Sequence, residues 1–394
     1  MPTLRLIADD LTGALDTAVE FVGVYGPIAV ERSDALSENL PDCLAIDSRT
    51  REKTAAEAEA IVGGIAPLLR GADLAFKKVD SLFRGPWAAE LAACFRLGYW
   101  RHCILAPAFP HHGRHTKGGR QVLYAGKDAW RDVSGDLVTH LRAEGLPAFH
   151  TTLDNLEGKH IPDGIHVFDA HTDDDLDAII ACVSSRLEGP VLWSGTGGLA
   201  RALARNIELA TQLPPHAERD AGERHPAPSV PISRRLQRPV LGLFGSDQPI
   251  TLAQLQACGP NWLKLGEGAD AKTVDHQIRQ SGVAMVSLDL PTGLERDDAA
   301  RCIAASFGRM ARALPAPGTL IVAGGETLRN LCSALDVSAL SITGQAAPGL
   351  PRSTIVGGPW QGTTVISKSG AFGGPTLWRD LLSENGLIAG GEEP

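Results

Sequence analysis

The sequence predicts an α/β protein of two domains, each a mainly parallel sheet flanked by helices. Three observations support this prediction. Short apolar runs alternate with longer helical patterns along the chain, and a proline-rich segment interrupts the alternation past the middle. The length of 394 residues also exceeds the roughly 100–200 residues typical of one domain.

The strands predicted for the first half are apolar throughout rather than alternating, which is typical of strands buried on both faces of a parallel sheet. Apolar residues at helical spacing predict helices at 13–24 and 54–69. The predicted strands are 4–8, 43–46, 74–76, 104–106, 165–168 and 191–193.

A change in amino-acid composition separates the two halves of the chain. Prolines mixed with charged residues, without an apolar period, predict a linker at 213–238. The first domain is therefore expected at 1–212 and the second at 239–394. Strand patterns resume at 240–244, 284–288, 319–323 and 364–367.

Charge and composition exclude several classes of protein. The net charge is −9 and no basic run exceeds two residues, which argues against a nucleic-acid partner. No apolar stretch has the length of a signal peptide or a membrane span. Scattered cysteines without a C-x-x-C pair argue against a disulfide framework and a cysteine-rich zinc site. We expect a cytoplasmic protein, with a homodimer as a reasonable expectation.

Two adjacent carboxylates, Asp9 and Asp10, lie where the first strand ends and a helix begins. Ligands bind beyond the carboxyl ends of parallel strands. Helix capping by Asp10 or Thr12 explains one acidic residue but not two. We therefore expect a functional role for at least one of the pair.

A second polar group follows the third strand and contains Lys78, Asp80, Ser81 and Arg84. Lys and Arg side chains at this spacing are suited to bind a carboxylate, while an aspartate accepts a hydroxyl proton. A solvated loop with surface ion pairs is the alternative.

Three histidines, His111, His112 and His115, lie in a segment bracketed by prolines at 106–116. Their spacing is not that of a metal-binding helix pair. We expect a loop that lines the substrate pocket, although exposed histidines without a ligand also fit the pattern.

Gly195, Gly197 and Ala200 match a dinucleotide-binding fingerprint after a strand. The second half of such a unit, a strand ending in an acidic residue, is missing. We expect these glycines to serve close packing of strand and helix, and keep an NAD-dependent oxidoreductase as an alternative.

The second half of the chain contains several glycine-rich loops, and some of them follow predicted strands. Glycine lets backbone N–H groups approach phosphate oxygens, and helix N-termini favour anions. No P-loop motif is present. Several such loops at one sheet edge would form a nucleotide site. They lie at 244–247, 323–327, 348–351, 356–358 and 368–374.

The order and spacing of these motifs resemble the four-carbon acid sugar kinases, formerly a family of unknown function, over nearly the whole chain. The first domain contains D-D-L-T-G-A-x-D at 9–16, K-K-x-D-S at 77–81, P-A-F-P at 107–110 and G-x-x-G-L-A at 195–200. The second contains G-S at 245–246, G-G-E-T at 324–327, P-G-x-P at 348–351 and K-S-G-x-F-G at 368–373.

The resemblance implies an acid-sugar-binding first domain, an ATP-binding second domain and an active site in the cleft between them. It implies ATP- and Mg²⁺-dependent phosphorylation of threonate, erythronate, 3-oxo-tetronate or a branched relative such as 3-oxo-isoapionate. The implied substrate residues are Asp9, Asp10, Arg49, Lys78, Asp80, Ser81 and Arg84. Asp80, slightly ahead of Asp10, is the expected proton acceptor. The implied nucleotide residues are Ser246, Gly324, Gly325, Glu326, Thr327, Gly370 and Gly373.

Five residues depart from the family pattern: Leu82, Pro86, His115, Gln248 and Ala371. The first three border the substrate motifs, so a different acid sugar is expected. A non-catalytic protein that binds nucleotide or acid sugar is the remaining alternative.

Overall fold

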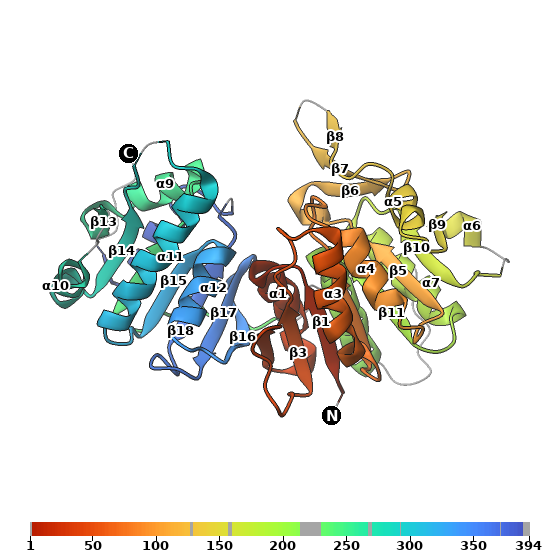
Figure 1. The fold of residues 1–394 in the computed structure, drawn as a ribbon, viewed down its shortest axis with the longest axis horizontal. Coiled ribbons are helices and arrows are strands. Elements are labelled where there is room, and N and C mark those ends of the chain that lie inside the picture. Colours follow the sequence, from red (N-terminus) through yellow and green to blue (C-terminus); the bar gives the residue numbers. More distant parts are fainter. Residues whose placement is uncertain are drawn as a thin grey trace. The chain divides into compact units, whose positions relative to one another are not determined.

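The computed structural model describes residues 2–126, 129–156, 160–212, 230–266, 270–291, 293–370 and 372–388. The chain forms two compact units, Met1–Val230 and Pro231–Pro394 (Figure 1). Each unit combines a mainly parallel sheet with helices, which confirms the predicted fold class. The predicted linker at 213–238 lies outside the described residues as far as residue 229.

The sheet of the first unit has the strand order β2-β3-β1-β4-β11-β5-β10-β9, and all its strands are parallel. All six predicted strands are present. The prediction missed β2 and β9 at the two ends of this order, because their polar residues break the apolar run. The strands are β1 (Leu4–Ala8), β2 (Ile28–Arg32), β3 (Cys43–Asp47), β4 (Leu74–Lys78), β5 (His102–Ala106), β9 (Ala148–Thr151), β10 (Gly164–Phe168) and β11 (Val191–Gly195).

Helices cover both faces of this sheet. Successive side chains of a strand point to opposite faces, so an apolar strand needs a covering layer on each side. Ala75 belongs to the core beneath α4, whereas the Phe76 ring packs against Phe21 with 6.1 Å between centroids. The helix predicted at 13–24 is interrupted by a 3₁₀ turn. The helices are α1 (Leu11–Ala18), α2 (Val22–Tyr25), α3 (Ala55–Ile65), α4 (Trp87–Phe95), α5 (Leu137–Ala143), α6 (Leu153–Leu156), α7 (Asp173–Arg186) and α8 (Gly197–Gln212), with 3₁₀ turns η1 (Val19–Phe21), η2 (Ala66–Leu69) and η3 (Pro110–His112).

A small antiparallel sheet extends from the first unit (Figure 1). It consists of β6 (Arg114–Lys117), β7 (Arg120–Tyr124) and β8 (Trp130–Asp132). The segment expected to be a loop at 106–116 thus ends in a strand. A search for apolar runs misses β6, because its residues are mostly polar. The strand forms through backbone hydrogen bonds to β7.

The second unit has the strand order β13-β14-β12-β15-β18-β17-β16. Neighbours from β13 to β18 are parallel, and β18-β17-β16 are antiparallel. All four predicted strands are present. The strands are β12 (Val240–Phe244), β13 (Trp262–Leu265), β14 (Val283–Leu288), β15 (Thr319–Ala323), β16 (Ala339–Ala347), β17 (Leu350–Val356) and β18 (Thr364–Lys368).

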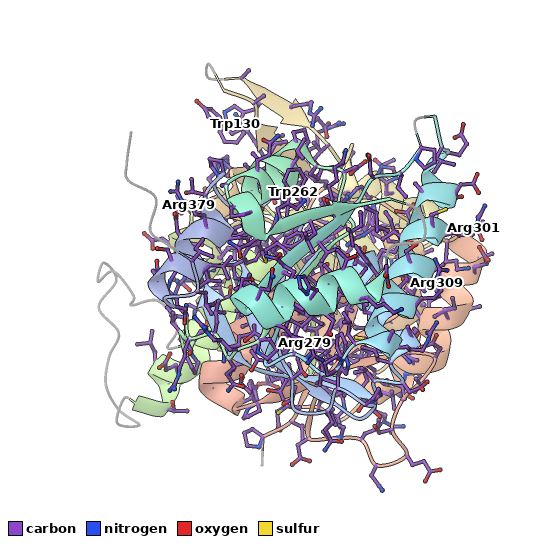
Figure 2. The ribbon with its side chains drawn as sticks, turned by 90° about the vertical axis from the view of Figure 1, so that its left-hand side faces the viewer. Trp130, Trp262, Arg279, Arg301, Arg309 and Arg379 are labelled. Atoms are coloured by element: carbon purple, nitrogen blue, oxygen red, sulfur yellow. The ribbon has the colours of Figure 1, made fainter. Side chains whose placement is uncertain are left out.

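The helices of the second unit are α9 (Pro249–Gln256), α10 (Ala271–Ser281), α11 (Arg296–Ala313), α12 (Gly325–Ala334) and α13 (Leu377–Glu384), with the 3₁₀ turn η4 (Gly259–Asn261). Figure 2 shows Arg279 on α10 and Arg301 on α11, whose side chains are about three-quarters exposed. The residues just before β12 bond to this unit, since the Ser233 amide donates to Gln345 and the Gln237 amide to Thr319.

Within the described part of the chain, no helix has the length and apolar character needed to cross a membrane.

Candidate active site

Three adjacent parallel strands of the first unit, β3, β1 and β4, carry polar side chains beyond their carboxyl ends. The register pairs Ala8 with Asp47 and Ile7 with Lys77, so the residues that follow these strands meet at one sheet edge. We call seven charged side chains there the strand-end cluster: Asp9, Asp10, Arg51, Lys78, Asp80, Arg84 and Arg114.

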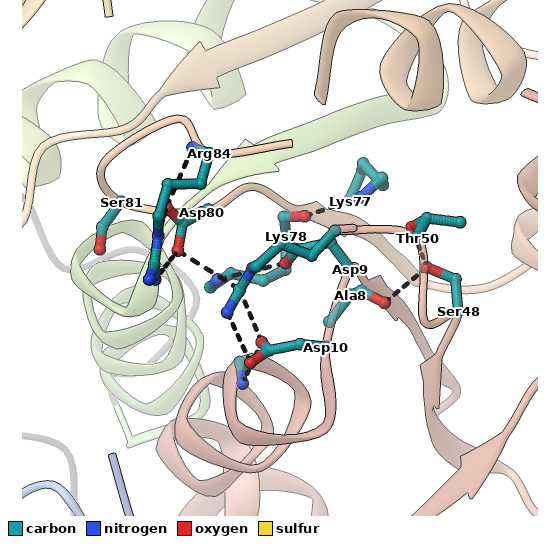
Figure 3. A network of polar contacts seen from close by, with 12 residues as sticks. Ala8, Asp9, Asp10, Ser48, Thr50, Lys77, Lys78, Asp80, Ser81 and Arg84 are labelled. Atoms are coloured by element: carbon teal, nitrogen blue, oxygen red, sulfur yellow. Dashed lines mark hydrogen bonds and ion pairs between the residues drawn. The ribbon is translucent and has the colours of Figure 1, made fainter. Parts of the chain in front are cut away.

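Arg51 lies at the centre of this cluster, because it contacts all three of its carboxylates. Figure 3 shows the polar network around these carboxylates. Its Nε donates to Asp9 Oδ2 at 2.7 Å. Its Nη1 and Nη2 donate to the two Asp10 oxygens at 2.6 and 2.7 Å. Nη2 also lies 3.3 Å from Asp80 Oδ1. Burial alone would lower the Arg51 pKa, but the three carboxylates raise it, so this guanidinium stays charged.

The loop after β3 holds Arg51 in place through its backbone. The Thr50 amide donates to the Asp9 carbonyl at 3.0 Å, and the Ser48 amide and hydroxyl both donate to the Ala8 carbonyl at 2.8 Å. Gly85 packs on the other side, where a Cβ would lie 2.5 Å from the Arg51 carbonyl oxygen. Its φ of +77° also favours glycine.

Asp80 organises the loop after β4. Its Oδ2 accepts from the amides of Leu82 and Arg84 and from Arg84 Nε, and its Oδ1 accepts from Arg84 Nη2. Burial would raise the Asp80 pKa, but Arg84 and Arg51 lower it far below the ordinary value. Asp80 is therefore ionised at neutral pH, with its oxygens held by backbone amides and Arg84.

The adjacent lysines of β4 point to opposite faces of the sheet, as strand geometry requires. Lys77 is fully buried and donates to Glu90 Oε2 of α4 at 2.7 Å. Lys78 instead faces the strand-end cluster, with its Nζ 3.9 Å from Asp9 Oδ1. A Cβ on Gly13 would lie 2.8 Å from Lys78 Nζ and 2.6 Å from Asp10 Oδ1, so the small residue at the start of α1 gives these groups room.

Asp16 is a further carboxyl group close to this cluster, and the prediction did not include it. Its Oδ1 is buried and has no hydrogen-bond partner among the described residues. Burial and the negative charge of Asp10 raise the Asp16 pKa to about 8, against the opposing effect of Lys78. Asp16 thus holds its proton to a higher pH than an ordinary aspartate does.

Arg114 joins the cluster from β6. Its Nη1 donates to the Ser81 hydroxyl. The next residue, His115, lies on the opposite face of β6, where its ring packs on Trp130 at 4.4 Å between centroids. His115 therefore does not border the substrate residues as expected. His112 is half-buried beside Phe109, and burial lowers its pKa to about 4.

The second unit assembles three glycine-rich loops at the carboxyl ends of β12, β15 and β18, which are neighbours in the sheet. A Cβ on Gly245 would lie 2.2 Å from Thr327 Oγ1, and one on Gly370 would lie 2.3 Å from Ser246 Oγ. The loops therefore pack closely through hydroxyl groups. Gly324 has a φ of +106° and precedes α12, whose N-terminus opens at this edge.

Lys368, the last residue of β18, fixes the third loop. Its Nζ donates to the carbonyl oxygens of Ser369, Gly370 and Phe372 at 3.2, 2.8 and 3.0 Å. Burial lowers the Lys368 pKa to about 8. Gly373 has a φ of +87°. Peptide groups whose carbonyls turn toward a buried lysine are arranged to present N–H groups elsewhere, as anion-binding loops do.

Comparison with known proteins gives the family. Residues 4–148 match the model of a sugar-binding N-terminal domain, and residues 241–377 match that of a nucleotide-binding C-terminal domain. The chain is 33% identical to D-threonate kinase from Cupriavidus necator, over 95% of this chain and 96% of the relative. The chain belongs to the four-carbon acid sugar kinase family.

Two further proteins are also similar over nearly full length. A 3-oxo-tetronate kinase from Pseudomonas fluorescens is 28% identical, over 99% of this chain and 98% of the relative. The crystal structure of a Haemophilus influenzae protein is 18% identical and covers 97% of this chain and 100% of its own, with a TM-score of 0.68. The latter likeness shows a common fold.

Most substrate residues predicted for this acid sugar kinase family member meet at one edge of the first unit, but Arg49 does not. Arg49 is exposed with a φ of 55°, and among the described residues no side-chain bond joins it to the cluster. Arg51 occupies the central place instead. Both arginines follow the same strand, so the sequence offered no means to choose between them.

The predicted nucleotide residues gather at the edge formed by β12, β15 and β18. Two further glycine segments differ: Gly349 lies beside the Phe372 ring, whereas Gly357 and Gly358 lie against Ser338 and Leu335, near the end of α12. The latter two therefore do not belong to this edge. Ala371 lies outside the described residues.

The glycines of the apparent dinucleotide fingerprint serve close packing. A Cβ on Gly195 would lie 2.7 Å from the Ala106 carbonyl oxygen, and one on Gly197 would lie 3.1 Å from the Phe109 ring. The turn from β11 to α8 thus rests on the chain that follows β5. Together with the family membership, this contact leaves the oxidoreductase alternative without support.

Proposed function

We propose that this protein is an ATP-dependent kinase that transfers the γ-phosphate to a hydroxyl group of a small acid sugar. The observation that carries the proposal is the excess of cations in the strand-end cluster of a sugar-binding domain, because a sugar acid carries a negative charge. The full-length similarity to D-threonate kinase and 3-oxo-tetronate kinase supports it.

The first unit binds the acid sugar in this proposal. Lys78 and Arg84 contact its polar groups, and Arg51 holds the carboxylates of Asp9 and Asp10 in place through hydrogen bonds. Asp10 is the better candidate for the proton acceptor, because its side chain is 23% exposed whereas that of Asp80 is 4% exposed. Asp80 is engaged by backbone amides and Arg84, which suits an anchoring role. The Arg49 side chain remains a predicted substrate contact.

The second unit binds ATP in this proposal. Backbone N–H groups at Gly325 and Gly370, together with the N-terminus of α12, favour phosphate oxygens, whereas the Gly324 N–H already donates to the Lys368 carbonyl. The Ser246 and Thr327 hydroxyls add donors between the loops. Phosphoryl transfer depends on positioning and charge neutralisation, so the reaction requires the sugar hydroxyl to reach the γ-phosphate in line.

Mg²⁺ is proposed to enter as the MgATP complex. Among the described residues no three His, Cys, Asp or Glu side chains form a metal cage. Mg²⁺ is usually held by substrate phosphates, waters and one or two carboxylates. Glu326 and Asp247 are exposed carboxylates on the nucleotide loops and fit that role.

The test is ADP release from MgATP in the presence of single acid sugars. The panel contains the threonates and erythronates, their 3-oxo forms and branched five-carbon relatives such as 3-oxo-isoapionate. Substrate-dependent ADP release with one of them supports the kinase and names its acceptor. ATP binding without release on any acid contradicts the proposal and favours a non-catalytic binding protein. Asp10→Asn and Asp80→Asn then assign the base. Loss of kcat with an altered pH profile is expected for Asp10→Asn.

The predicted homodimer and cytoplasmic location stay predictions. Light scattering coupled to size-exclusion chromatography measures the mass of the protein in solution and tests the first.

A further inference from the structure

The strand-end cluster contains four cations and three carboxylates. Three of the cations are engaged by these carboxylates. Arg51 contacts all three, Arg84 bonds to Asp80 through two nitrogens, and Lys78 pairs with Asp9. The fourth cation, Arg114, has no carboxylate within ion-pair distance among the residues that the structure describes.

The surroundings of Arg114 leave its guanidinium only partly satisfied. Its hydrogen bond goes to a neutral group, the Ser81 hydroxyl, and its buried Nε has no hydrogen-bond partner in the described structure. Burial lowers the Arg114 pKa, and the nearby charge of Arg84 lowers it further against the opposing effect of Asp80. A guanidinium taken out of water without a counter-charge costs free energy.

The backbone holds Arg114 firmly. Its amide donates to the Phe109 carbonyl at 3.2 Å and its carbonyl accepts from the Phe109 amide at 2.7 Å. Gln121 of the neighbouring β7 donates to the carbonyl oxygens of Pro107 and Ser81 at 3.1 and 3.5 Å. This bracing joins the small sheet to the loop after β4, so Arg114 and Ser81 are positioned before any ligand arrives.

We propose that Arg114 binds the carboxylate of the acid sugar and thereby selects acids over neutral polyols. A carboxylate accepts two parallel N–H bonds from a guanidinium and supplies the missing counter-charge. The Ser81 hydroxyl lies beside it as a further donor. This inference rests on the proposed kinase function and adds the residue that recognises the charged end of the substrate.

The experiment compares D-threonate with threitol, its neutral four-carbon counterpart, in the wild type and in Arg114→Gln, Arg114→Lys and Arg120→Gln. Arg120 lies on the same small sheet and forms an exposed ion pair with Asp132, so its variant is the matched control. ADP release gives kcat/KM for each compound, and calorimetry gives its Kd. The KM for ATP and the thermal midpoint report whether each variant is folded.

Arg114→Gln is expected to lower kcat/KM and affinity for D-threonate by about 30-fold or more, the usual effect of removing one partner of a buried charge pair. Threitol should change less than about threefold, because it makes no ion pair. Arg114→Lys should recover part of the loss, since it retains charge but not the paired N–H groups. Arg120→Gln should match the wild type.

Equal losses for D-threonate and threitol, or an unchanged preference for the acid, overturn the assignment to Arg114. A wild type that binds D-threonate but shows no ATP-dependent turnover of any acid in the panel contradicts the kinase function, while the calorimetric comparison still tests Arg114. If the wild type binds D-threonate no better than threitol, the proposal for Arg114 is wrong. If Arg114→Gln does not fold, the comparison between Arg114→Lys and the wild type decides by the same criterion.

Discussion

Gly370→Ala should weaken ATP binding without affecting the acid sugar. A Cβ at this position would lie 2.3 Å from Ser246 Oγ and 3.2 Å from Gln248 Cγ. The loop cannot easily retreat, because the Gly370 carbonyl accepts from Lys368 Nζ at 2.8 Å and from Thr251 Oγ1 at 2.9 Å. Overpacking of this kind costs roughly 1–3 kcal/mol. If that cost falls on the ATP-bound arrangement, the KM for ATP rises roughly 5- to 150-fold.

The assay measures the KM for ATP at saturating acid sugar, and the KM for the acid sugar at saturating ATP. Gly374→Ala is the matched control, because a Cβ there meets no atom within 4 Å. It should leave both constants unchanged. An unaltered KM for ATP in Gly370→Ala, or a rise confined to the acid sugar, would refute the assignment of this loop to the nucleotide.

Three further variants test buried titratable groups. The Asp16 pKa is raised from 3.8 to about 8, so the wild type should lose stability as pH rises through that range. Asp16→Asn should flatten the dependence of the thermal midpoint on pH. If the variant and the wild type show the same dependence, the raised pKa is wrong. Lys77→Met leaves Glu90 buried without its partner and should cost about 3–5 kcal/mol of unfolding free energy in urea titrations, whereas adding Glu90→Leu should restore most of it. Lys368→Met should raise the KM for ATP and leave the KM for the acid sugar unchanged. In the wild type, the KM for ATP should rise above pH 8, because the Lys368 amine loses its proton there. A KM for ATP that does not change with pH would argue that Lys368 does not hold this loop.

Much of the architecture followed from local sequence. Continuous apolar runs predicted the central strands, because a strand covered by helices on both faces must be apolar along its length. Parallel strands place their carboxyl ends at one edge, so Asp10, Lys78 and Asp80 could be predicted to meet although 70 positions separate the first from the last. The prediction missed strands rich in polar residues, such as β6, because backbone pairing and not an apolar run stabilises them.

Which side chains meet was decided by tertiary structure. Arg49 and Arg51 follow the same strand, but the backbone bonds between the loop and Asp9 direct Arg51 into the carboxylates. Arg114 could not be singled out from the sequence, because its surroundings depend on the loop after β4, which supplies Ser81. The sequence by itself determined the strands and the residues at their ends. Ion pairing depends on distances between segments remote in sequence, and therefore only the folded chain decided which cation was left for the substrate.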